Sequence, residues 1–228
     1  MNTLLLRLSV GATLLFIAYF MASTLAPFLA VSLGVPPATL GAIVSATFVL
    51  PLFLAILAGR GVDAFGSRPL LVAGMMLLAI APLGVILRPS VVTLLLLQVL
   101  TGLGQLLAVV AAQALVAQLG EGRLRERNYG VYGAFVSVGQ LIGPITAGAM
   151  LDGVGFVGAF SLVIAVAVAG MVMFVSLGPT RVRLDRAAKP PRRTKEAFAP
   201  SQRAAGERAA FPSARVFDLL ALSPVRVS

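Results

Sequence analysis

The side chains best suited to bind a ligand are uncharged amides and hydroxyls inside long apolar runs. Gln98, Thr101, Gln105 and Gln113 fall in one such run. At 100° per residue of helix they lie within about 120° of one face. An amide is costly in lipid unless it is paired or hydrated. This face should therefore line a water-filled cavity or form hydrogen bonds to other helices.

Other chemistry is excluded by composition. The chain has no cysteine and no histidine, which removes thiol chemistry, histidine-based metal sites and Ser-His catalysis. Asp63 and Asp152 stand at the ends of apolar runs, and no acidic or basic residue lies deep inside one. We therefore expect no enzymatic activity, no metal and no cofactor.

The elements that must position these residues are membrane-spanning helices. Of the 228 residues, 59% are hydrophobic and 11% are charged, whereas a soluble chain carries about 25% charged residues. Runs of about 20 apolar residues are needed to cross a bilayer. The sequence predicts six spans, at about 8–32, 38–58, 69–87, 91–117, 129–151 and 155–177.

The distribution of basic residues predicts how these spans are oriented. With the N-terminus in the cytoplasm, all but one of the 18 Lys and Arg residues fall on the inner side, and only Arg88 is outside. Basic residues are retained on the cytoplasmic side of a membrane. The pattern predicts a multi-pass protein of the plasma (inner) membrane with both termini in the cytoplasm.

The residues after the last span have a different composition. Residues 181–215 hold ten basic and three acidic residues. We expect residues 179–215 to be a disordered cytoplasmic linker that associates with anionic membrane lipid rather than with nucleic acid. Residues 216–228 include a short apolar stretch, interpreted as the approach to a further span.

An internal repeat relates the second span to the fifth. Residues 40–66 align without gaps to residues 129–155, an offset of 89, with eight identities in 27 positions. A G-x-x-x-D-x-x-G pattern ends both segments. An offset of three spans reverses direction across the membrane. The sequence therefore predicts two inverted three-helix repeats, at about 1–88 and 89–178, a plan found in many secondary transporters.

The segment Gly59 to Arg68 resembles the major facilitator superfamily. That family has a G-x-x-x-D-[RK]-x-G-[RK]-[RK] signature in the loop between helices 2 and 3. Gly59, Asp63, Gly66 and Arg68 match it, whereas Ala64 and Ser67 replace basic residues. The resemblance implies that this loop acts as a conformational latch in the outward-facing state, with a plain solvated loop as the alternative.

A second resemblance lies in the fifth span. Gly139, Gly143, Pro144 and Gly148 are similar to the family's antiporter motif G-x-x-x-G-P-x-x-G-G, with Ala147 replacing one glycine. Small residues at four-residue spacing let another helix approach closely, and Pro144 bends the helix. The resemblance favours export by antiport, and ordinary helix packing is the alternative.

A third family motif, R-x-x-Q-G-x-G, is only partly present. Gly102 and Gly104 match it, but Gln98 stands where the family often has the arginine implicated in proton coupling. This departure puts proton coupling through these six spans in doubt.

The resemblance also implies where substrate binds. In the family, helices 1 and 4 line a central cavity, which brings Tyr19 and Ser23 towards the amides, with Gln140 beside them. The expected cavity is Tyr19, Ser23, Gln98, Thr101, Gln105, Gln113 and Gln140. It is neutral, which suits a small amphiphilic or hydrophobic substrate better than a phosphate or a dicarboxylate.

The fold expected is thus all-α, the six-helix half of a major facilitator transporter over residues 1–178, with a second half absent from the sequence. The expected function is secondary transport by alternating access. The first prediction is efflux of drug-like or metabolite molecules, with protons as a candidate coupling ion. The alternatives are an uptake symporter of the same fold and a non-transporting six-helix partner or remnant. A second half or a homodimer would complete the cavity.

Overall fold

The computed structural model describes residues 3–177 of the chain. The expected linker at 179–215 and the apolar stretch at 216–228 lie outside the described residues. A second half would likewise lie outside the described residues.

Within the described range the protein consists of helices joined by short turns, and each helix is long and apolar enough to cross a membrane. The all-helical fold expected from the sequence is confirmed. The five helices are α1 (Thr3–Ser32), α2 (Pro37–Phe65), α3 (Ser67–Leu87), α4 (Val91–Ala117) and α5 (Gly122–Val175).

The helix ends follow from residues with strong local preferences. Pro36 and Pro37 open α2, because proline is tolerated in the first helical turn, where its missing N–H is not needed. Ser90 caps α4 through a reciprocal capping box with Thr93, whose backbone N–H donates to Ser90 Oγ at 3.2 Å. Gly66 alone separates α2 from α3.

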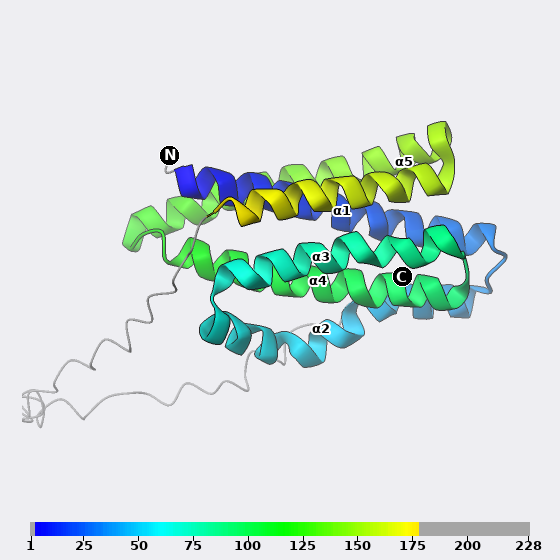
Figure 1. Cartoon of the computed structure of the whole chain (residues 1–228), viewed down its shortest axis with the longest axis horizontal. Coiled ribbons are helices and arrows are strands. Elements are labelled where there is room, and N and C mark those ends of the chain that lie inside the picture. Colours follow the sequence, from blue (N-terminus) through cyan, green and yellow to red (C-terminus); the bar gives the residue numbers. More distant parts are fainter. Residues whose placement is uncertain (1–2, 178–228) are drawn as a thin grey trace, which may run out of the picture. The chain divides into compact units, whose positions relative to one another are not determined.

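The prediction of six separate helices differs from the structure, which has five in residues 3–177. The fifth and sixth predicted spans both belong to α5, which is broken only at Gly155, where φ is 69° and ψ is −174°. Figure 1 shows the chain reversing direction there, so that the yellow part of α5 returns beside α1. We call residues 122–154 the first arm of α5 and residues 156–175 its second arm.

Two helix boundaries differ from the predicted spans. Residues 60–65 continue α2, and residues 122–128 begin α5, although both segments lie outside the spans predicted at 38–58 and 129–151. Charged residues are compatible with helix once the segment lies at a membrane boundary, where their side chains reach water. The break between the spans predicted at 129–151 and 155–177 lies at Gly155.

The core forms around α1. This helix packs mainly on α5, while α3 and α2 both pack on α4, and Figure 1 shows α1 alongside both arms of α5. Leu15, Met21 and Leu25 on α1 are completely buried. By contrast, α2 exposes large apolar side chains along its length, with Leu52 77% and Ile56 73% exposed.

Candidate functional site

The antiporter-like motif forms the contact between α1 and the first arm of α5. A Cβ at Gly139 would stand 2.6 Å from the Thr13 carbonyl oxygen, and one at Gly143 would stand 2.8 Å from Phe20 Cβ. Ala147 continues this face and is fully buried. Gly148, in contrast, has open space around it. The motif therefore brings two helices into backbone contact, as small-residue stripes do in membranes.

The signature residues lie at the junction of α2 and α3. Gly59 and Asp63 belong to the last turns of α2, and Asp63 is exposed, without an ion pair inside residues 3–177. Gly66 adopts φ 88° and ψ 167°, a region of backbone conformation open essentially to glycine alone. A side chain at this position would strain the turn that reverses the chain.

Arg68, the last signature residue, lies close to the end of α5. Its Nη2 donates to the Val175 carbonyl oxygen at 2.6 Å, and Arg7 Nη1 donates to the next carbonyl, that of Ser176, at 3.2 Å. Terminal helix carbonyls have no partner within the helix, and cations are stabilising beside them. Two arginines thus cap the C-terminal end of α5. Neither contact was predicted from the sequence.

The amide face of α4 is only partly assembled. Gln98 and Thr101 are buried, with Gln98 1% exposed. Thr101 Oγ1 donates to the Leu97 carbonyl oxygen of its own helix at 2.7 Å, whereas Gln98 Oε1 has no hydrogen-bond partner among the described residues. Gln105 is half-buried and Gln113 is exposed.

The α1 residues of the expected cavity lie in an aromatic cluster. Tyr19 is buried and meets the Phe20 ring edge-on at 5.1 Å between centroids, and Phe20 stacks with Phe16 at 6.2 Å. Ser23 is half-buried one turn further along, whereas Gln140 on α5 is exposed. The seven residues therefore range from buried to exposed, and none of them lines the groove described next.

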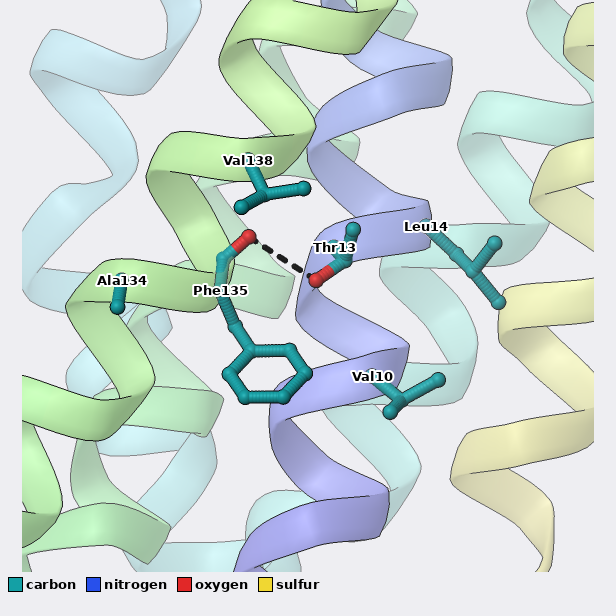
Figure 2. A pocket seen from close by; sticks show the side chains of 6 residues that line it. All are labelled: Val10, Thr13, Leu14, Ala134, Phe135 and Val138. Atoms are coloured by element: carbon teal, nitrogen blue, oxygen red, sulfur yellow. Dashed lines mark hydrogen bonds between the residues drawn. The ribbon is translucent and has the colours of Figure 1, made fainter.

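An apolar groove of about 290 Å³ lies on the surface between α1 and the first arm of α5. Figure 2 shows its wall from α5 in green and its floor from α1 in blue. Thr13 Oγ1 donates across it to the Phe135 carbonyl oxygen at 2.9 Å. The groove was missed from the sequence, where only the four-residue spacing of small residues indicated that α1 and α5 meet. Its lining is Val10, Thr13, Leu14, Ala134, Phe135 and Val138.

Comparisons with known proteins support the fold. The family model described as Major Facilitator Superfamily matches residues 8–224. An uncharacterized MFS-type transporter of Mycobacterium tuberculosis, Rv1250, is 28% identical over 124 residues, which are 54% of this chain and 21% of that protein. The human organic anion transporter MFSD10 has a similar fold, with a TM-score of 0.64 and 19% identity over 78% of this chain and 48% of that one.

The matched region thus spans about a fifth of the mycobacterial relative and about half of the human structure. The resemblance found in the sequence is confirmed, and the expectation of a transporter family rather than an enzyme family is confirmed with it. By its helices, its motifs and the family model, this chain belongs to the Major Facilitator Superfamily.

Proposed function

We propose that residues 3–177 are one half of a secondary transporter, built from two inverted three-helix repeats, which exports small amphiphilic molecules by alternating access. In this scheme the second arm of α5 is the sixth span. Repeats of opposite sense exchange conformations, so that a site near the midplane opens to each side in turn.

The observation that carries the proposal is the pair of turns at Gly66 and Gly155. These glycines are 89 residues apart, the offset of the sequence repeat. Both have positive φ, 88° and 69°, and extended ψ, 167° and −174°. Each follows an exposed aspartate by three residues. Equivalent turns at equivalent positions support a duplicated unit.

Helix packing supports the same repeat. Gly102 on α4 packs directly against the Thr47 backbone of α2. The position 89 residues before Gly102 is Thr13, and the position 89 residues after Thr47 is Val136. Thr13 contacts Phe135 and the position of Gly139, on either side of Val136. The α2–α4 and α1–α5 contacts are therefore equivalent under the offset.

The exposed faces of α2 and the first arm of α5 follow the offset as well. Leu52 and its equivalent Leu141 are 77% and 66% exposed, and Ile56 and its equivalent Ile145 are 73% and 64% exposed. Paired apolar faces of this kind favour a complementary unit that packs between them. The proposed transporter thus needs a second such unit, from this polypeptide or another.

The substrate class rests on the buried polar groups. Gln98 Oε1 is buried and unpaired within the described residues, so a ligand donor would relieve its desolvation cost. The Phe16, Tyr19 and Phe20 rings supply apolar area. No charged residue is buried in residues 3–177. A neutral amphiphile or lipophilic cation suits these side chains better than an anion, which would need arginine or lysine.

Cysteine labelling tests the inverted repeat. The chain has no cysteine, so Asp63→Cys and Asp152→Cys each introduce one exposed thiol. A membrane-impermeant maleimide should label the two variants from opposite sides of oriented vesicles. Labelling of both from one side would reject the two-repeat scheme.

Transport is tested with ethidium, a lipophilic cation, in inverted membrane vesicles containing the full chain. Export in the cell corresponds to energised ethidium uptake by these vesicles. Gln98→Leu should abolish the uptake. Gln113→Leu should leave it unchanged, because it makes the same substitution on the same helix at an exposed position.

The remaining outcomes select the alternatives. Accumulation in right-side-out vesicles driven by an inward proton gradient would replace export with uptake by the same fold. No accumulation with either gradient, from a monodisperse protein, would favour a non-transporting membrane partner.

A further inference from the structure

We propose that the groove between α1 and the first arm of α5 binds an anionic phospholipid, with one acyl chain in the groove and the headgroup phosphate on Arg7 and Arg68. This site is separate from the expected cavity, and it does not depend on the proposed transport activity.

The lining of the groove suits a hydrocarbon chain. Its lining is almost entirely apolar, and it is open along one side. The single hydroxyl, that of Thr13, is already used, because it donates to the Phe135 carbonyl oxygen and also reaches the Ser9 carbonyl oxygen at 3.2 Å. The groove therefore offers a ligand apolar contact and no hydrogen bond (Figure 2).

The groove faces away from the interior of the bundle. On one side of its floor, Thr13 contacts the first arm of α5. On the other side, Leu14 Cβ would stand 3.3 Å from a Cβ at Gly170 on the second arm, and Gly11 contacts Phe174 there. The α1 surface that forms the floor therefore lies between its contact with the first arm and its contact with the second arm. The α1 residues that point inward, such as Leu8 and Leu15, are completely buried.

A positive site stands at one end of this groove. Arg7 and Arg68 donate to the carbonyl oxygens of two consecutive residues, Ser176 and Val175, which brings both guanidinium groups to the same end of α5. Neither forms an ion pair with a carboxylate in residues 3–177, and Arg7 is exposed. Two guanidinium groups without a counter-ion favour a phosphate, which accepts hydrogen bonds from both.

The register of α1 connects the two features. Val10 lies three residues after Arg7, about 4.5 Å along the helix axis at 1.5 Å per residue. Leu14 lies seven residues after Arg7 and therefore points in nearly the same direction. A phosphate at the arginines thus places the acyl chain at the mouth of the groove. This combination of charge and apolar length fits a lipid, whereas a free phosphate would leave the groove empty.

The test is lipid retention by the full chain in detergent, measured by native mass spectrometry during titration with dioleoyl phosphatidylglycerol or dioleoyl phosphatidylcholine. We expect one phosphatidylglycerol to bind in preference to phosphatidylcholine. In the double variant Arg7→Gln, Arg68→Gln the affinity should fall about thirtyfold, which corresponds to about 1 kcal/mol per arginine. Arg88→Gln, which removes one positive charge outside the proposed site, should leave the affinity unchanged.

The groove is tested separately with Val138→Trp, which fills it. Its control is Val49→Trp at the equivalent position of the first repeat, where the valine is 54% exposed against 48% for Val138. Only Val138→Trp should weaken retention of the dioleoyl lipid. Dihexanoyl phosphatidylglycerol, whose chains are short, should bind the wild type weakly.

Each contrary result overturns the proposal. The first is that phosphatidylglycerol and phosphatidylcholine bind equally well. The second is that the double arginine variant retains phosphatidylglycerol as the wild type does. The third is that Val138→Trp and Val49→Trp have equal effects. If the double variant is aggregated, Arg7→Lys, Arg68→Lys is used in its place. It keeps both charges and should keep the preference for phosphatidylglycerol, and loss of that preference would count against the phosphate site.

Discussion

The turns at Gly66 and Gly155 have nearly the same backbone conformation but different surroundings. Two residues after Gly66, Arg68 caps the end of α5, whereas two residues after Gly155 the chain has Val157, which is 59% exposed. Arg60, near the first turn, corresponds to Ala149 near the second. Backbone geometry and an aspartate are thus shared by the two halves of the sequence, while basic residues are placed at only one of the two turns.

The largest expected effects come from the two helix contacts that the halves share. Gly102→Val on α4 and Gly139→Val on α5 would each force side-chain atoms into a neighbouring backbone. Overpacking against backbone is not relieved by side-chain rotation, so we expect losses of about 3 kcal/mol. Unfolding in SDS followed by far-UV circular dichroism measures them. Gly130→Val, at a glycine with open space, is the control and should change little.

Substitution of the turn glycines should have the next largest effect. Gly66→Ala and Gly155→Ala place a Cβ on a backbone with positive φ, which should destabilise each variant by about 2 kcal/mol in the same SDS titration. Gly148→Ala is the control, because it lies within a helix and meets no neighbour. Unequal losses at the two turns would break the equivalence drawn between them.

A smaller effect is expected where only one half has a hydrogen bond. Thr13→Val removes the hydroxyl that donates to the Phe135 carbonyl oxygen, while the equivalent Gly102 has no side chain. Hydrogen bonds between membrane helices contribute about 0.6 kcal/mol, and we expect a loss of this size. Ser137→Ala, whose hydroxyl bonds only to its own helix at Gly133, should cost less.

The smallest effect should come from the arginine found at one turn alone. Arg68→Gln removes a cation from the last carbonyls of α5, at a cost of about 0.5 kcal/mol. The melting temperature of the detergent-solubilised protein should fall slightly at low salt. An unchanged melting temperature would mean that the cap contributes nothing to stability.

Much of the fold was predictable because lipid imposes strong rules on sequence. Apolar length predicted where membrane helices lie, and α4 was placed at residues 91–117 as the structure has it. The predicted ends of the second and fifth spans differ from the structure, because Arg60, Asp63 and Asp152 are compatible with helix when their side chains reach water. The turns were instead made by Gly66 and Gly155, the glycines that end the two aligned segments.

The expected cavity was predictable only as a set of helix faces. Gln98 and Thr101 are buried as an amide and a hydroxyl in lipid should be, but Gln113 on the same face is exposed. Helical periodicity predicts the direction in which a side chain points from the helix axis. Whether that side chain is buried also depends on how far the neighbouring helix extends. That extent is a property of the packed bundle.

Sequence by itself determined the all-helical membrane fold, the family and the 89-residue repeat, because each depends on residue type and spacing along one chain. Tertiary structure decided that Arg7 and Arg68 both donate to carbonyls at the end of α5 and that Thr13 donates to Phe135. These contacts join residues more than 100 positions apart, and no local preference links such residues. They exist only because α1, α3 and α5 pack side by side.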